Sequence, residues 1–315
     1  MSGPLQSPEP GFDIVDAQLH VGRAMIGETL EAMDALGIRS VLIDEFWGFW
    51  DSPNPTHIQP GFALPNGAWR AAWPTAEEAG LRCPERFAYL VRIDRRDPQL
   101  ESVMRLVGST PAARAVRLQP AWTLEEAEVF KNGGYDHVLS LARETGVPVC
   151  LFIPGYAEHL APYAERFPEV RLVIDHCGMG FPNIPPDRPE EEAQRTTDAA
   201  YLDEVLALAR YPNVYLKWCH AQDRFGAATY PYESLRPLLR RTIDAFGADR
   251  LMWASDKSVM FGHTWADLLF AVREDPGLSP VEKRAILGGT ARRVFDWPVP
   301  PPPPLNLENL TGAQS

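Results

Sequence analysis

The chain has 315 residues, and 30 Lys and Arg against 42 Asp and Glu give a formal net charge of −12. With 45% hydrophobic and 23% charged residues, the composition is that of an ordinary globular protein, and its acidity repels phosphate backbones and anionic lipid. Nucleic acid and membrane are therefore disfavoured as main partners, and we expect a small-molecule substrate.

The two ends of the chain differ in composition from its middle. Residues 1–10 have neither the basic start nor the apolar core of a signal peptide, and no run approaches the roughly 18 apolar residues of a membrane span. Five consecutive prolines occupy 300–304. We expect a flexible N-terminus over residues 1–10, one domain over 11–297 and an extended Pro-rich tail over 298–315.

Cysteine usage indicates the compartment. The four cysteines, at 83, 150, 177 and 219, lack C-x-x-C spacing, and three of them lie within apolar runs. This pattern suits buried thiols in a reducing compartment better than disulfides. We therefore expect a cytoplasmic protein.

Short apolar and β-branched runs predict eight strands in chain order. Their starts lie 24 to 47 residues apart, which leaves room for a crossover helix after each strand. The predicted strands are Ile14–His20, Ser40–Phe46, Phe87–Asp94, Ala113–Gln119, Val147–Ile153, Arg171–His176, Asn213–His220 and Arg250–Asp256. Stretches with helical spacing border most of them, namely Thr29–Leu36, Tyr135–Thr145, Ala157–Phe167, Tyr201–Ala209, Pro237–Phe246 and Pro280–Phe295.

Alternating strands and helices predict an α/β protein with a parallel sheet covered by helices. Eight such units favour a single-domain (β/α)8 TIM barrel. A doubly wound open sheet is the alternative, but no G-x-G-x-x-G follows the first predicted strand.

Two insertions interrupt this pattern, Trp47–Arg86 after strand 2 and Met179–Thr197 after strand 6. In a barrel both would leave the carboxyl ends of strands, where active sites are built. Trp47 and Trp50 would then stack on a planar substrate over the barrel mouth, or they would form a packed loop or a subunit interface.

Polar residues gather at the ends of the predicted strands. Strand alternation places Gln18 and His20 on one side, towards a common centre, with Leu19 facing the helices. In a closed barrel strand 8 returns beside strand 1, so Asp256 would lie close to His20, and His176 would converge from strand 6. Two imidazoles and a carboxylate suit a metal site or a proton-transfer site.

These residues carry a resemblance to a known family. Asp16-Ala-Gln-Leu-His20 resembles the strand-1 D-x-H-x-H motif of the amidohydrolase superfamily, in its amidohydrolase-2 branch of barrel hydrolases and decarboxylases. Later segments resemble markers of that branch in the same order, namely Val116-Arg117, Val173–Gly178, Asn213–Lys217, Arg250–Asp256 and Gly288–Arg292. The resemblance covers nearly the whole core and implies an amidohydrolase-like barrel.

Two departures from the family pattern concern the metal. Gln18 stands where the motif has its first histidine, and Phe152 occupies the strand-5 position that carries a histidine in metal-dependent members. His20, His176 and Asp256 remain as ligands for one divalent ion, zinc or manganese. The resemblance also includes lactonase-like members that lack the strand-5 histidine and are thought to use the strand-8 Asp as a metal-free general base.

Two further residues keep alternative interpretations. Arg117 is either an ion-pair partner of Asp44 or Glu45 or a bidentate ligand for a substrate carboxylate. His220 is either a satisfied polar residue at a strand end or a residue of the substrate pocket, together with Gln18.

The leading hypothesis is a hydrolase that opens a lactone, ester or amide in a small, planar or carboxylate-bearing compound. Asp256 would be the general base, and His20 and His176 would polarise the carbonyl or hold a metal. The first alternative is metal-dependent non-oxidative decarboxylation. The second is a catalytically reduced subunit that assembles with an intact paralogue, and a homo-oligomer is the other assembly considered.

Overall fold

The computed structural model describes residues 11–22, 25–45, 60–181, 184–185 and 187–299. The predicted flexible N-terminus (1–10) and nearly all of the Pro-rich tail (300–315) lie outside these residues. Trp47 and Trp50 also lie outside them, so the expectation that they cover a pocket stays a prediction.

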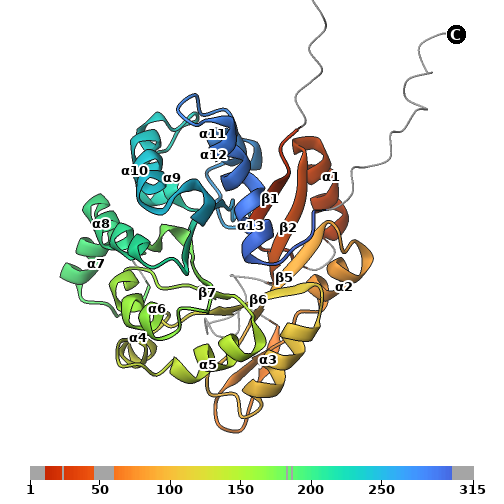
Figure 1. Ribbon diagram of the computed structural model, residues 1–315, viewed down its shortest axis with the longest axis vertical. Helices are drawn as coiled ribbons and strands as arrows, with labels where there is room; N and C mark the ends of the chain where they lie inside the picture. Colours follow the sequence, from red (N-terminus) through yellow and green to blue (C-terminus); the bar gives the residue numbers. More distant parts are fainter. Residues whose placement is uncertain (1–10, 23–24, 46–59, 182–183, 186, 300–315) are drawn as a thin grey trace, which may run out of the picture.

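Eight parallel strands form the centre of the molecule, in the order β1-β2-β5-β6-β7-β8-β9-β10 (Figure 1). Seven of the eight predicted runs contain one of these strands, and the run Ser40–Phe46 overlaps β2, which begins two residues earlier; this confirms the (β/α)8 barrel. The strands are β1 (Ile14–Leu19), β2 (Ile38–Asp44), β5 (Phe87–Arg92), β6 (Ala113–Leu118), β7 (Val149–Leu151), β8 (Leu172–Ile174), β9 (Val214–Trp218) and β10 (Leu251–Trp253).

Helices surround these strands on their outer side (Figure 1). Each predicted helical stretch contains helix, but short 3-10 turns divide the stretches at 157–167 and 201–209. The helices are α1 (Ile26–Leu36), α2 (Pro74–Arg82), α3 (Leu100–Ser109), α4 (Leu124–Lys131), α5 (Asp136–Thr145), α6 (Ala161–Arg166), α7 (Glu190–Thr197), α8 (Leu202–Leu206), α9 (Ala221–Arg224), α10 (Arg236–Phe246), α11 (Trp265–Arg273), α12 (Pro280–Arg284) and α13 (Thr290–Val294).

Two hydrophobic clusters stabilise the barrel from its two sides. The large outer cluster packs the strands against the helices, with Val41, Phe87 and Leu216 among its buried members. The small inner cluster fills the barrel with side chains such as Leu42 and Ala115. Strands buried on both sides read as continuous apolar runs, and this is why the sequence pattern located them.

The first and last strands close the ring. The backbone N–H of Asp256 donates to the carbonyl of Gln18 at 2.9 Å, and the Asp16 carboxylate accepts from the Ser255 backbone N–H at 2.9 Å. The register between β1 and β2 shifts between Asp16 and Leu19. Leu19 joins the outer cluster, as expected, while the Gln18 side chain reaches charged groups on β2 and β9.

The amino end of the barrel is sealed by the C-terminal helices. A five-residue π-helix, Ala285–Gly289, passes so close to the start of β1 that a Cβ on Gly288 would lie 1.8 Å from the carbonyl oxygen of Asp13. Nearby, the Arg292 guanidinium donates to both oxygens of Asp13, each at 2.9 Å, and to Ser40 Oγ at 2.8 Å. This end is therefore closely packed and internally paired.

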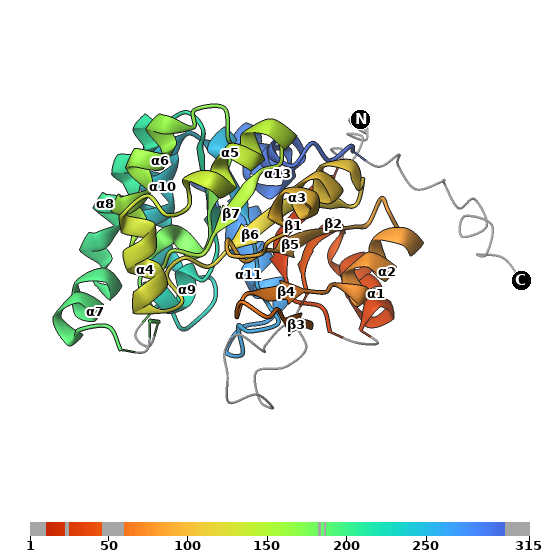
Figure 2. The ribbon, with the colours of Figure 1, turned by 90° about the horizontal axis from the view of Figure 1, so that it is seen from below.

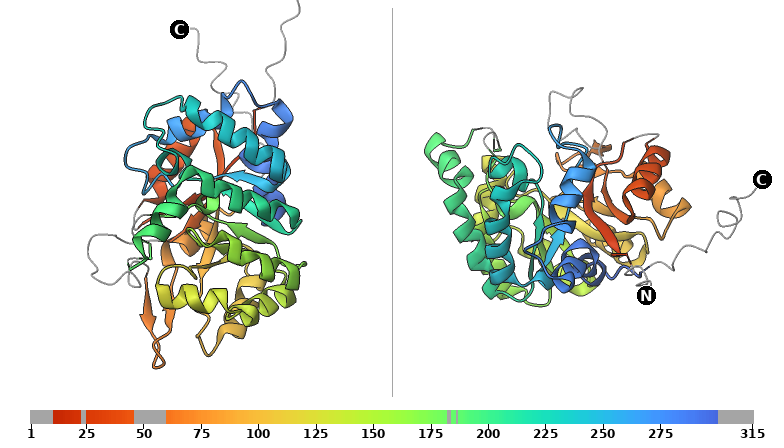
Figure 3. Two further views of the ribbon diagram at one scale, coloured as in Figure 1. Left: turned by 90° about the vertical axis from the view of Figure 1, so that its left-hand side faces the viewer. Right: turned by 90° about the horizontal axis from the view of Figure 1, so that it is seen from above.

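The two insertions add elements outside the barrel. The described part of the first contains an antiparallel hairpin, β3 (Gly61–Ala63) and β4 (Trp69–Ala71), followed by α2. Figures 2 and 3 show this hairpin, in orange, extending beyond the strands at one end of the barrel. The second insertion contains α7. Within the described residues, we find no helix with the length and apolar character that crossing a membrane requires.

Candidate active site

A cavity of about 390 Å³ opens where β1, β6, β8, β9 and β10 end. It gathers residues from the ends of these strands, from the ends of β5 and β7, and from the loops that follow. Its lining consists of His20, Arg92, Arg117, Gln119, Trp122, Phe152, His176, Phe181, Ile184, His220, Asp223, Arg224, Asp256, Val259 and Phe261.

Three polar residues of this cavity have left-handed backbone conformations. The φ angles are 54° at His176, 58° at His220 and 46° at Asp256. Non-glycine residues adopt this region at a cost of roughly 1 to 3 kcal/mol each, and such strain concentrates at functional sites. The turn that follows β8, β9 or β10 thus aims a polar side chain into the cavity.

Three imidazoles meet the carboxylate of Asp256. His220 Nε2 lies 2.9 Å from Oδ2, His176 Nε2 lies 3.7 Å from Oδ2, and His20 Nε2 lies 3.2 Å from Oδ1. All four side chains are buried. Apart from this contact with His20, Oδ1 accepts no hydrogen bond from the described residues, so it keeps the capacity to accept a proton or a ligand.

The tautomer of His20 follows from its second contact. Its Nδ1 lies 2.8 Å from the backbone carbonyl oxygen of Asp44, and that oxygen can only accept a hydrogen bond. Nδ1 therefore carries the proton, and Nε2 is directed at Asp256. A carbonyl that fixes an imidazole in this way is the usual support behind a metal-binding or catalytic histidine.

The charges around Asp256 differ from residue to residue. Burial raises the pKa of Asp256, but His20 and His220 outweigh this and keep it below its ordinary value, so the carboxylate is ionised at neutral pH. Burial and the positive charges of His220 and Arg117 hold the pKa of His176 well below its usual value. Burial lowers the pKa of His220, yet the neighbouring carboxylates of Asp223 and Asp256 raise it overall.

Arg117 belongs to a buried network of charges beneath the cavity. It donates to Asp44 and, through Nε at 2.7 Å, to Asp175, and it lies 3.3 Å from His176 Nε2. Arg92 binds Asp44 with two bonds of 2.7 and 2.6 Å. The ion pair with Asp44 is thus present, while Glu45 instead accepts from the backbone at the start of α2.

Lys217 is the charged residue that the sequence pattern missed. Its fully buried ammonium lies 2.9 Å from Asp175 and donates to Gln18 Oε1 at 2.8 Å. Burial lowers its pKa, but Asp175 raises it further, so the ammonium remains charged. The amide nitrogen of Gln18, Nε2, donates to Asp44 at 3.2 Å. Gln18 therefore lies below the cavity and does not line it.

Aromatic rings line the cavity beside the histidines. The Phe152 ring lies 5.4 Å from His176 and 5.6 Å from Phe181, and Trp122 lies 5.8 Å from Phe152. The residue that replaces a strand-5 histidine therefore packs edge-on against the strand-6 imidazole. The cavity combines an apolar surface with a polar centre, as small-molecule sites do.

The ligand set available to a metal ion differs slightly from the predicted one. His176, Cys219, His220 and Asp256 place one donor atom each within 4.8 Å of one another. Burial raises the pKa of the Cys219 thiol well above its ordinary value, so an ion that uses this sulfur would have to displace its proton. The group thus contains the predicted His176 and Asp256 and adds Cys219 and His220, whereas the predicted ligand His20 is not part of it and lies beside Asp256.

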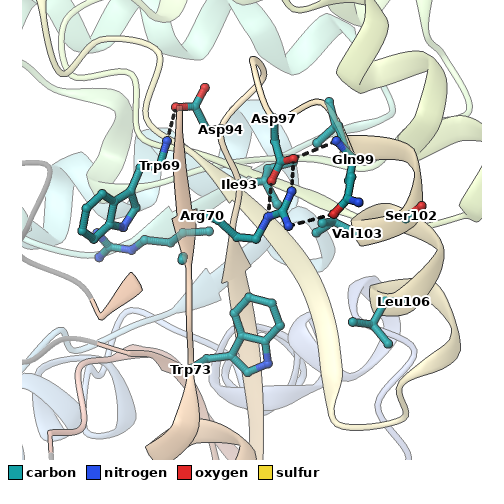
Figure 4. Close-up of a pocket in the computed structure, with 13 residues that line it drawn as sticks. Trp69, Arg70, Trp73, Ile93, Asp94, Asp97, Gln99, Ser102, Val103 and Leu106 are labelled. Carbon is teal, nitrogen blue, oxygen red and sulfur yellow. Dashed lines mark hydrogen bonds and ion pairs between the residues drawn. The ribbon is translucent and has the colours of Figure 1, made fainter. Parts of the chain in front are cut away.

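A second pocket, of about 280 Å³, lies between the β3–β4 hairpin and α3 (Figure 4). Arg70 in its wall donates to Asp97 and Gln99, and the backbone N–H of Trp69 donates to Asp94. Its polar groups are thus engaged with one another. The convergence of histidines and a carboxylate marks the barrel cavity as the candidate active site.

Fold and site together define a (β/α)8 barrel with a histidine and aspartate centre at the carboxyl ends of its strands. The family model described as Amidohydrolase matches residues 70–297. The chain belongs to the amidohydrolase family, in the branch predicted from the sequence.

Individual relatives match less completely. The chain is 31% identical to an L-fucono-1,5-lactonase of Burkholderia ambifaria over 150 residues, which are 45% of this chain and 47% of that protein. The chain thus spans about half the length of this curated relative.

Solved structures share the fold over nearly the whole chain. A Burkholderia multivorans amidohydrolase with bound zinc has a TM-score of 0.66 at 18% identity, covering 90% of this chain and 99% of its own. A putative 2-pyrone-4,6-dicarboxylic acid hydrolase of Pseudomonas putida has 0.60 at 20%, covering 91% and 99%. The 5-carboxyvanillate decarboxylase of Sphingomonas paucimobilis has 0.60 at 14%, covering 91% and 100%.

Proposed function

We propose that this protein hydrolyses a small lactone, with Asp256 as the base that takes a proton from the attacking water. The observation that carries the proposal is the ionised carboxylate of Asp256, held among three imidazoles, with Oδ1 accepting no hydrogen bond beyond its contact with His20. Geometry and protonation state both suit a general base. The partial match to a lactonase supports the choice of substrate class.

The remaining groups have distinct roles in this scheme. His220 donates to Oδ2 and keeps the carboxylate ionised and oriented. His20 and His176 border the place where the carbonyl oxygen would develop charge. After attack, the proton held at Oδ1 is available to the alkoxide that leaves when the ring opens. The aromatic wall of Trp122 and Phe152 would receive the flat ring.

A divalent ion, zinc or manganese, is included in the proposal. His176, His220 and Asp256 would hold it, and the sequence-predicted ligand His20 lies beside Asp256. When bound, such an ion polarises a carbonyl and lowers the pKa of water.

Two alternatives lead to different products or assemblies. Metal-dependent decarboxylation would use the same histidines, and the metal-ligand donor set supports it. A catalytically reduced subunit would act only beside a paralogue. Trp47 and Trp50 remain proposed substrate-stacking residues, and a homo-oligomer or a hetero-oligomer remains a proposed assembly.

Product analysis before and after chelation tests these options. The purified protein is incubated with a panel of aldonolactones and with ortho-hydroxybenzoates, and acid release and CO2 release are followed separately. Acid release from a lactone is the expected result. CO2 release without acid release would establish the decarboxylase instead. Activity only after addition of a paralogous chain would establish the subunit hypothesis. Metal content measured on the same samples decides whether hydrolysis needs the ion.

A further inference from the structure

Three guanidiniums line the active-site cavity, and their surroundings differ. Arg92 is held by both oxygens of Asp44. Arg117 is held by Asp44 and Asp175. Both positive charges are thus neutralised by carboxylates of the protein, so neither is available to neutralise a substrate.

Arg224 is the exception among these three. Its Nη1 donates to the backbone carbonyl of Gly180 at 3.0 Å, and its guanidinium carbon lies 4.1 Å from the centre of the Phe181 ring. Its Nε is buried without a hydrogen-bond acceptor among the described residues. The same residues supply it with no ion-pair partner. Burial lowers the pKa of Arg224 overall and outweighs the negative charge of Asp223, which raises it.

The adjacent Asp223 does not fill this role, because two imidazoles share its carboxylate. His220 Nδ1 lies 3.7 Å from one oxygen, and His263 Nε2 lies 3.4 Å from the other. The carboxylate is therefore turned towards the histidines, and it acts on Arg224 through its charge without forming an ion pair with it.

Local structure explains why Arg224 faces the site. The backbone N–H of Arg224 donates to the carbonyl of His220 at 2.9 Å, which forms one turn of α9. Residues four apart in a helical turn lie on the same face, so Arg224 follows His220 into the cavity. Phe181 lies between them, 5.6 Å from the His220 ring and beneath the Arg224 guanidinium.

We propose that Arg224 is the specificity residue that binds a carboxylate carried by the substrate at a position away from the reacting carbonyl. The ligand is then a lactone bearing a free carboxylate, with its ring on the aromatic wall and its acyl carbon at Asp256. A guanidinium with open donors binds such a group through two parallel bonds. The identity of the ring rests on the proposed lactone hydrolysis, whereas the anion site does not.

Binding of two open-chain acids tests this assignment without turnover. D-Gluconate has one carboxylate, and D-glucarate differs only by a second carboxylate at the far end. Calorimetry with the full-length protein should show glucarate binding at least about tenfold tighter than gluconate, because charge-assisted bonds to a partly buried guanidinium are strong. Arg224→Gln should reduce this ratio to about one, and Arg224→Lys should keep part of it.

The control is Arg105→Gln, which removes an exposed guanidinium on α3 and should leave the ratio unchanged. Thermal unfolding of each variant shows that the fold is retained, and Arg224→Lys keeps the test valid if Arg224→Gln is unstable. Equal affinity of the wild-type protein for the two acids, or an unchanged ratio in Arg224→Gln, overturns the proposal.

Failure of the proposed function is recognised separately. If no lactone is hydrolysed, but the glucarate preference disappears in Arg224→Gln, the anion site stands and only the lactonase assignment is rejected. If lactones are hydrolysed, but neither the hydrolysis nor the glucarate preference changes in Arg224→Gln, the lactonase assignment stands and the carboxylate site is rejected.

Discussion

The two ends of the barrel differ in which residues adopt left-handed backbone conformations. At the carboxyl end these residues include His176, His220 and Asp256. At the amino end, Gly37 and Gly247 follow the ends of helices and have positive φ angles of 74° and 81°. Glycine accepts this conformation without steric cost, but histidine and aspartate do not. Among the described residues, strained non-glycine positions are therefore concentrated at the end that carries the imidazoles, and the amino end has Asp296, with φ 46°. The difference indicates that one end is built to hold reactive groups and the other to stabilise the fold.

The largest effect is expected at the carboxyl end. Asp256→Asn should lower kcat by about 10² to 10⁴, because the amide has nearly the same shape but cannot take a proton. The fold should be retained, which circular dichroism and thermal unfolding would check. Residual activity within about tenfold of wild type would remove Asp256 from the role of base.

At the amino end, Gly288→Ala should lower the free energy of unfolding by about 3 kcal/mol, because the added Cβ collides with the Asp13 carbonyl. The kcat per folded molecule should not change. Gly27→Ala in α1, where a Cβ meets open space, is the matched control and should be neutral or stabilising. A large loss of kcat in Gly288→Ala at full stability would contradict the separation of the two ends.

Asp16 lies where β1 meets β10, so its titration reports on the contact between these two strands, which we call the seam. Burial raises its pKa from 3.8 to about 6. The folded protein therefore holds a proton that the unfolded chain releases, so this contribution to stability is complete below pH 3.8 and is lost as the pH rises through about 6. Relative to Asp16→Asn, wild type should lose about 2 to 3 kcal/mol between pH 4 and pH 7.

Chemical denaturation of both proteins at several pH values measures this difference. The Asn variant has no titrating group at the position, so it cancels the contributions of other carboxylates. Parallel stability curves for the two proteins would show that Asp16 is not protonated in the folded state at mildly acidic pH.

The smallest effect is expected at Gly37, the C-cap of α1. A Cβ there meets no atom within 4 Å, so Gly37→Ala carries only the cost of the left-handed conformation, about 1 to 2 kcal/mol. Measured against Gly27→Ala, this value calibrates the strain borne by His176, His220 and Asp256. Equal unfolding free energies for the two variants would show that a positive φ costs little stability in this fold. The contrast in backbone strain between the two ends of the barrel would then be weaker.

The barrel and the centre of the site could be predicted because they depend on local patterns. Buried parallel strands are apolar runs, and strand alternation placed Gln18 and His20 on the inner side. Charge partners are a different matter. Lys217 was hidden within an apolar run, and the partners that keep it charged come from β1 and the end of β8.

Other omissions have the same cause. His263 carries no local signal, yet it meets Asp223 and Tyr232 across the loops after β9 and β10. Arg224 could have been suspected from its spacing four residues after His220. Its unpaired state depends on which carboxylates face it, and one sequence does not contain that information.

The seam between β1 and β10 also bears on how the protein is made. Asp256 follows the last strand of the barrel, and its backbone N–H reaches the carbonyl of Gln18 on the first. A ribosome releases residues 14–20 long before residues 251–256. Until then the growing chain holds an open sheet with two exposed edges, and the general base Asp256 is not yet in place. Ring closure and completion of the site are then one event, and chains that stop short of residue 250 should be inactive and prone to aggregate through those edges.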